Sequence, residues 1–406
     1  MNQHQEHREH SAVAITMAIC LIYAINGGVR GNFGTLLGPI AESSGLSYGD
    51  VSFVLATSQL LFGLLQPAFG ILALRTSERF VLVLGVLLMA ASFLLTPFCH
   101  AMWSLGVTLG VLLPAGTAAL SFGLLLGIAA GQLPPSRSAS VSGFLNASSG
   151  LGTTVLAPVL QALAAAFGLL GAMLFLGLPS LMLLPLAFWL CRGRKARALA
   201  GKDAGRPESG RAMIGHALKS RSYIYLLTGF FTCGFHMAIL ETHFFNQLVT
   251  FDFSRETSSF VFAVYGVLTM IGSAAAGMLC TKYSMKRILG SLYAVRVLLA
   301  CVILVMPASL ALMLPFVVVL GLTSDSTVSP TAGLILREFG PAKLPTLFGL
   351  AFLTHQVGCF ASAWLGGILA EATGGYTALW VCDGLLSALA ATVSFMVRED
   401  EMPAQG

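Results

Sequence analysis

The chain carries the ten residues GILALRTSER at positions 70–79 and a second copy, GMLCTKYSMK, at positions 277–286. Each copy is a short basic loop led by glycine, and each follows the second long apolar run of its half of the sequence. Such a loop, repeated half a chain apart between hydrophobic segments, indicates a duplicated membrane bundle. The residues that we expect to be structural in these loops are Gly70, Arg75, Arg79, Gly277, Lys282 and Lys286.

The composition also favours a membrane protein. Of the 406 residues, 56% are hydrophobic and only 10% are charged, and the mean hydropathy is +0.84. Many apolar runs reach the roughly 20 residues that a membrane-spanning helix needs. We therefore predict an all-α membrane protein with twelve transmembrane helices in two pseudo-symmetric six-helix bundles. The predicted spans are 13–40, 48–74, 80–99, 102–130, 138–166, 169–191, 222–247, 257–280, 287–306, 309–336, 344–370 and 375–397.

The basic residues predict the topology, because lysine and arginine collect in cytoplasmic loops. With the N-terminus inside, all of them except Arg30, Arg255 and Arg296 fall in cytoplasmic segments. We expect a multi-pass protein of the bacterial inner membrane, in contact with membrane lipids and with both termini in the cytoplasm. The predicted segments are a tail (1–12), an N-terminal bundle (13–191), a linker (192–221), a C-terminal bundle (222–397) and a second tail (398–406).

The repeat extends beyond the two loops. The loops lie 207 residues apart, and the further matching pairs lie 206 residues apart. Six spans in each half is an even number, so both halves enter the membrane in the same orientation and form two parallel bundles. The further matching pairs are Gly28 with Gly234, Arg30 with His236, Gly143 with Gly349 and Gly152 with Gly358.

The twelve spans, the central linker and the two basic loops resemble the major facilitator superfamily, whose loop signature runs roughly Gly-x-Leu-x-Asp-Arg-x-Gly-Arg-Arg. This chain has Leu74 and Thr281 where the signature has Asp, and Ser77 and Ser284 where it has the later Gly. The resemblance implies the major facilitator fold and solute transport by alternating access.

Three further segments resemble bacterial relatives of the monocarboxylate and oxalate/formate porters. They are GGVRGNFG at 27–34 with Pro39, GFFTCGFH at 229–236 and HQVG at 355–358. This resemblance implies a small organic anion, such as a monocarboxylate, as substrate. The charged pair that monocarboxylate porters typically carry in the eighth span is absent from residues 260–280.

Arg30 is the first candidate for the substrate site. A charge at the bilayer centre costs roughly 2.5–3.5 kcal/mol, so it needs a partner, water or a function. Tyr23, Asn26 and Arg30 share one helical face, and a guanidinium can bind a carboxylate through two parallel hydrogen bonds. We predict that these three residues bind substrate; the alternative is a structural arginine paired with a carboxylate of a neighbouring helix.

Embedded histidines are further candidates for substrate binding. His236 and His243 share a face of the seventh span, and a neutral imidazole can donate to an anion or accept a proton near neutral pH. His355 and Gln356 lie about 11 residues into the eleventh span, near its middle at about 1.5 Å per residue. We predict all four as substrate-binding residues. The alternative is hydrogen-bonded packing for His236 and His243, and hydrogen bonding across the interface between the halves for His355.

Embedded acids are candidates for proton coupling, since a partly desolvated carboxyl group can take up and release a proton. Asp325 lies in the polar patch TSDST at 323–327 and is the first choice, and Glu241 is the second. Glu241 lies nearer the outer end of its span and alternatively only reaches water. Asp383 and Arg296 are predicted to form a structural pair.

Several function classes lack support in the sequence. It contains no GxxxxGK[ST] loop for ATP and no pattern of an enzyme, a metal site, a cofactor site or a nucleic-acid surface. We predict a monomeric secondary transporter that moves a small organic anion with a proton. The alternatives are a proton-driven exporter of drugs or metabolites and, in a different class, a membrane receptor without solute flux.

Overall fold

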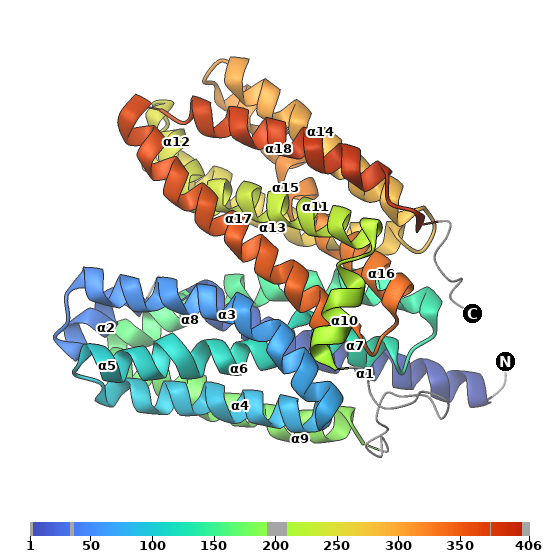
Figure 1. Ribbon diagram of the computed structural model, residues 1–406. Coiled ribbons are helices and arrows are strands. Elements are labelled where there is room, and N and C mark those ends of the chain that lie inside the picture. The colour runs from blue at the N-terminus through green and yellow to red at the C-terminus, as the bar shows by residue number, and fades with distance from the viewer. Residues whose placement is uncertain (1–2, 33–35, 193–208, 374, 400–406) are drawn as a thin grey trace. The chain divides into compact units, whose positions relative to one another are not determined.

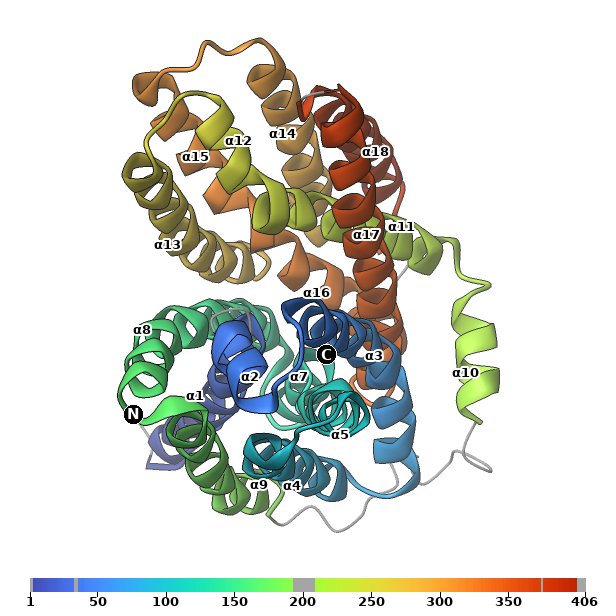
Figure 2. The ribbon, with the colours of Figure 1, turned by 90° about the vertical axis from the view of Figure 1, so that its left-hand side faces the viewer.

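The computed structural model describes residues 3–32, 36–192, 209–373 and 375–399, and the regular elements in these ranges are all helices (Figures 1 and 2). Most of the predicted linker, residues 193–208, and most of the predicted C-terminal tail, residues 400–406, lie outside the described residues. The first helix begins at Gln3, so it extends into the segment predicted as the N-terminal tail.

The helices confirm the predicted all-α membrane fold. Eleven described helices are long and apolar enough to cross a membrane. One of them, residues 137–190, has 54 residues, or about 80 Å at 1.5 Å per residue, which is enough for two crossings. Its backbone leaves the helical conformation at Gly168, with φ +65°, between the predicted spans 138–166 and 169–191. This long helix therefore holds two of the twelve spans.

The chain divides into two compact units, and α8 and α17 each contribute residues to both. The first unit comprises residues 1–134, 148–210 and 341–350. Its elements are α1 (Gln3–Asn32), α2 (Leu37–Ser44), α3 (Tyr48–Arg75), α4 (Glu78–Leu95), η2 (Thr96–Phe98), α5 (Met102–Leu105), the π-helix η3 (Gly106–Leu112), α6 (Leu113–Ala119), α7 (Phe122–Ala130), most of α8 (Pro135–Leu181) and α9 (Leu183–Leu190).

The second unit comprises residues 135–147, 211–340 and 351–406. Its elements are most of α10 (Gly210–Ala217), α11 (Arg221–Ala238), the π-helix η4 (Ile239–His243), α12 (Phe244–Thr250), α13 (Arg255–Leu279), α14 (Met285–Val305), α15 (Leu310–Ser324), η5 (Asp325–Thr327), α16 (Val328–Phe339), most of α17 (Leu344–Thr373) and α18 (Thr377–Phe395).

Glycines at equivalent positions of the repeat form the closest helix crossings. In the first unit, a Cβ on Gly152 of α8 would lie 1.8 Å from the carbonyl oxygen of Ala24 in α1. In the second unit, a Cβ on Gly358 of α17 would lie 2.1 Å from the carbonyl oxygen of Phe231 in α11. Small residues allow helix backbones to approach closely in membranes, so the same crossing is built twice.

The glycines of the signature loops are also crossing points. Gly70, near the end of α3, would place a Cβ 2.5 Å from the backbone nitrogen of Thr346 in the first unit. Gly277, near the end of α13, would place one 2.6 Å from the Cα atom of Gly143 in the second unit. The leading glycine of each copy is therefore required by packing rather than by the turn that follows it.

The two signature serines end the loops in different ways. Ser77 caps α4 by accepting a hydrogen bond from the backbone N–H of Phe80. Ser284 instead donates to the carboxylate of Glu399, 2.5 Å away, and that carboxylate accepts the backbone N–H groups of Met285 and Lys286, each at 3.0 Å. An acid at a helix N-terminus also interacts favourably with the helix dipole, so Glu399 caps α14.

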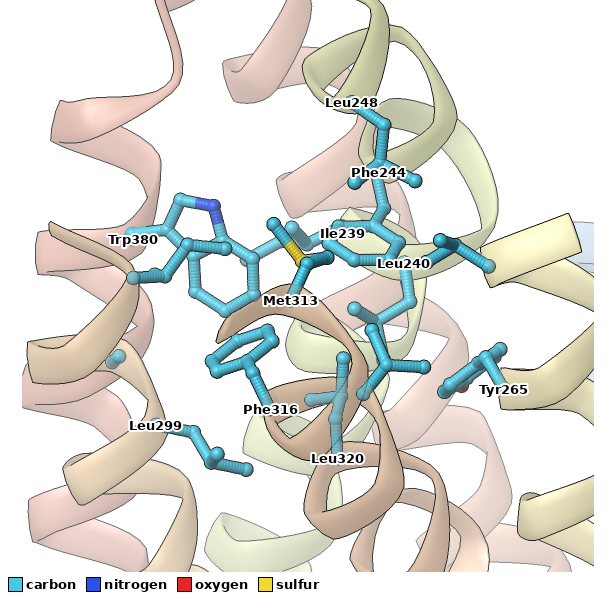
Figure 3. Close-up of a cluster of buried hydrophobic side chains, with 14 of the residues drawn as sticks. Ile239, Leu240, Phe244, Leu248, Tyr265, Leu299, Met313, Phe316, Leu320 and Trp380 are labelled. Carbon is cyan, nitrogen blue, oxygen red and sulfur yellow. The ribbon is translucent and has the colours of Figure 1, made fainter. Parts of the chain in front are cut away.

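The core of the second unit lies between α11, η4, α12, α13, α14, α15 and α18. Trp380, Phe244, Met313 and Phe316 are buried in it beside Ile239, as Figure 3 shows. The Trp380 indole N–H donates to the Oε1 atom of Gln247 at 2.7 Å, which satisfies the one polar group of that ring.

Candidate substrate site

Arg30 lines a cavity of about 280 Å³ within the first unit. Its guanidinium lies over the ring of Phe62, with 3.6 Å between the Cζ atom and the ring centroid. A cation over an aromatic face is stabilised by the ring quadrupole. The remaining residues that line the cavity are Leu37, Ser52, Leu55, Ala56, Ser58, Gln59, Leu113 and Thr117.

The end of α1 is fixed so that Arg30 reaches this cavity. Arg30 lies in the last turn of α1, where the helix dipole favours a cation. The side-chain amide of Asn32 donates to the carbonyl oxygens of Gly28, at 2.8 Å, and Thr153 of α8, at 2.9 Å. Gly28 and Gly31 pack against α8. One side of α1 is thus used for packing, while Arg30 remains partly exposed to the cavity.

Asn26 and Tyr23, which we predicted as partners of Arg30, lie one and two helical turns away from it in packing contacts. Asn26 is fully buried and its side-chain amide donates to the carbonyl oxygens of Thr117, at 2.9 Å, and Leu120, at 2.7 Å. Tyr23 is buried with its ring edge toward Phe122, 5.7 Å between centroids. These contacts join α1 to α6 and α7, and neither residue is among those that line the cavity.

His236 in α11 is completely buried and paired with an acid of α18. Its Nδ1 atom lies 2.9 Å from the Oδ2 atom of Asp383, and neither side chain has exposed surface. Asp383 therefore pairs with His236, and our prediction of a pair between Asp383 and Arg296 is wrong. Spacing within one helix could not reveal this partner, because the two residues come from the seventh and twelfth spans.

Arg296 of α14 is also fully buried. Its Nη2 group donates to the backbone oxygen of Ser324, and lies 3.5 Å from the Thr327 hydroxyl and 3.7 Å from the thiol of Cys233. The guanidinium is held at the junction of α15 and η5 by neutral acceptors rather than by an ion pair.

The other predicted residues of the second unit have separate surroundings. His243 is buried in the π-helix η4, with its Nε2 atom 3.3 Å from the carbonyl oxygen of Ala363. His355 of α17 stacks on Phe352. Its Nδ1 atom lies 3.4 Å from the Oε1 atom of Gln356, and the Gln356 side chain is buried. Each histidine therefore has its own polar contacts, and their roles in substrate binding stay predictions.

The two predicted proton-coupling acids differ in exposure. Asp325 is half-buried in η5, and its backbone oxygen accepts the side-chain amide of Asn146 at 3.2 Å. Glu241 is exposed. Three residues of α3 that line the cavity were not predicted from the sequence: Ser52, Gln59 and Phe62. Gln59 and Phe62 follow Ser52 by seven and ten residues, but this spacing does not indicate which other helix they contact.

Comparisons with known proteins agree on one family. A model described as the Major Facilitator Superfamily matches residues 19–289 and 246–406. The uncharacterised MFS-type transporter YcxA of Bacillus subtilis is 24% identical over 394 residues, covering 93% of this chain and 94% of that protein. Monocarboxylate transporter 12 of Homo sapiens is 24% identical over 366 residues, covering 83% of this chain and 70% of that protein.

Solved structures show the same fold. A bacterial homologue of the iron transporter ferroportin, in its outward-facing state, matches with a TM-score of 0.74 and 14% identity, covering 94% of this chain and 99% of that one. The fucose:proton symporter of E. coli matches with a TM-score of 0.73 and 11% identity, covering 95% and 98%. The matching family and the named relatives are transporters, not enzymes. The chain belongs to the Major Facilitator Superfamily.

Proposed function

We propose that this transporter moves a small organic anion, specifically a monocarboxylate, across the bacterial inner membrane together with a proton. The observation that carries the proposal is Arg30, a cation held at the wall of a small cavity. A guanidinium presents a planar pair of N–H donors that matches a carboxylate. The names of the human and mouse relatives, monocarboxylate transporters 11 and 12, support the same substrate class.

The size and lining of the cavity support a small substrate. At about 280 Å³, it lies just below the roughly 300–1,000 Å³ of pockets for drug-sized ligands. Ser52, Ser58 and Gln59 supply polar groups, and Phe62, Leu55 and Leu113 supply apolar contacts. A carboxylate with a short apolar chain would use both. This favours the monocarboxylate over the alternative of a proton-driven drug exporter.

Asp325 remains our first candidate for proton coupling and Glu241 the second. A half-buried carboxyl group can change its protonation as its surroundings change, whereas a fully exposed one responds less. The half-buried position of Asp325 supports this order. The basic residues of the loops support a topology with both termini in the cytoplasm.

The proposal is tested by uptake of radiolabelled lactate, pyruvate, acetate and oxalate into proteoliposomes under an imposed proton gradient. We expect accumulation of at least one monocarboxylate by the wild type. Arg30→Gln should abolish it, because the neutral amide cannot hold the anion, and Arg30→Lys should retain part of it. Arg211→Gln, an exposed arginine of α10, is the matched control. Failure of the wild type to accumulate any of the three monocarboxylates, lactate, pyruvate and acetate, would refute the proposal.

A further inference from the structure

The pair of His236 and Asp383 is unusual in having polar atoms without partners in a fully buried setting. Nδ1 and Oδ2 bond to each other at 2.9 Å, while His236 Nε2 and Asp383 Oδ1 have no hydrogen-bond partner among the described residues. A buried polar atom without a partner is costly, and an unpaired buried charge more so. The protonation state of this pair therefore strongly affects the stability of its surroundings.

Charged and titratable groups surround the pair. Arg296 of α14 interacts electrostatically with Asp383 of α18 and with Asp325 of η5. His236 is the base in direct contact with Asp383, so a proton bound by this pair changes the charge of the buried cluster by one. The other titratable groups around the cluster are Cys233 of α11, Tyr265 of α13, Tyr293 of α14 and His355 of α17.

Further buried hydroxyl groups lie on the same helix face as Asp383. Asp383, Ser387 and Ser394 lie on the buried face of α18, at spacings of four and seven residues. Within the described part of the chain, the hydroxyl groups of Ser387 and Ser394 have no hydrogen-bond partner. On the facing helix α11, the Thr232 hydroxyl lies 3.4 Å from the carbonyl oxygen of Leu386. The buried face that holds Asp383 therefore carries two more polar groups without partners.

We propose that the His236–Asp383 pair is a proton-binding site of this transporter. One proton bound there adds one positive charge to the buried cluster that also holds Arg296 and Asp325. In a proton-coupled symporter, the proton and the anion bind with positive coupling, each favouring the other by the same factor. The coupling rests on the function proposed above, whereas the proton site itself does not.

Trp380 provides a direct reporter. Its ring lies 6.2 Å from that of His236 in an edge-on arrangement, and both side chains are buried. A protonated imidazole quenches the fluorescence of a neighbouring indole. The chain has four tryptophans, and the other three, Trp103, Trp189 and Trp364, are exposed. Replacing those three by phenylalanine leaves Trp380 as the reporter, in purified protein held in lipid nanodiscs.

The pH titration of this single-tryptophan protein needs no substrate. We expect a fluorescence step that fits one proton, is lost in His236→Gln and is displaced in Asp383→Asn. His100→Gln, which replaces an exposed histidine outside the cluster, should keep the step unchanged. A flat titration, or a step that survives unchanged in His236→Gln, would overturn the proposal.

The coupling is measured in proteoliposomes with labelled lactate as the probe. Asp383→Asn should retain exchange of external for internal lactate, and should lose accumulation driven by the proton gradient. Proton-driven accumulation equal to that of the wild type would contradict the role of the pair. If the wild type moves no lactate, the proposed function fails in this assay, while the fluorescence step still decides whether the pair binds a proton.

Discussion

The duplicated crossing at Gly152 and Gly358 leads to a quantitative prediction. Replacing either glycine by alanine places a Cβ 1.8 Å from the Ala24 oxygen or 2.1 Å from the Phe231 oxygen, where ordinary contact begins at 3.4 Å. The backbones must therefore separate by about 1.5 Å, and overpacking of this kind costs about 1–3 kcal/mol. We expect Gly152→Ala and Gly358→Ala each to lower the free energy of unfolding by that amount.

The assay is unfolding by SDS titration in mixed micelles, with the midpoint of thermal unfolding as a second measure. Gly266→Ala is the matched control, because Gly266 lies within α13 and a Cβ there would meet no atom within 4 Å. Alanine is the better helix former by about 0.5–1 kcal/mol, so this variant should be as stable as the wild type or slightly more stable. If Gly152→Ala and Gly358→Ala matched Gly266→Ala, the close crossings would not exist as described.

Two further substitutions test contacts that hold the bundles together. Glu399→Ala should lower the free energy of unfolding by about 1–3 kcal/mol, because the α14 N-terminus loses its cap. The control is Glu42→Gln, which replaces an exposed acid of α2. Equal stability of the two variants would contradict the capping role. Asn26→Ala should lower the free energy of unfolding by about 1–3 kcal/mol, since it removes the donor to the carbonyl oxygens of Thr117 and Leu120. An unchanged midpoint of thermal unfolding together with lost lactate uptake would instead support the substrate-binding role predicted from sequence.

The sequence predicted the fold well because the signals for a membrane bundle are local and repeated. Apolar length predicts each span, the basic loops predict the orientation in the membrane, and the copies at 70–79 and 277–286 indicate the duplication. The glycine pairs of the repeat, such as Gly152 and Gly358, are the ones that the structure places at equivalent crossings. The differences concern helix bounds, since α1 begins at Gln3, within the predicted tail, and α8 continues to Leu181 with non-helical backbone at Gly168.

The candidate site was less predictable because it depends on contacts between helices. Arg30 could be singled out, since an arginine in an apolar span is costly. Phe62 and Gln59 could not be assigned to the site, because the sequence of one helix does not indicate which face of another helix it contacts. The partner of His236 is Asp383, 147 residues away, and Glu399 reaches α14 from the end of the chain. Such pairings arise from tertiary packing.

The most direct test of the central claim is a thermal-shift measurement on the purified transporter with lactate, pyruvate, acetate and oxalate. A ligand that binds only the folded state raises the unfolding temperature as its concentration increases. We predict a rise with at least one monocarboxylate for the wild type and for Arg211→Gln, and no rise for Arg30→Gln. An undiminished rise in Arg30→Gln would contradict the claim that Arg30 holds the substrate anion.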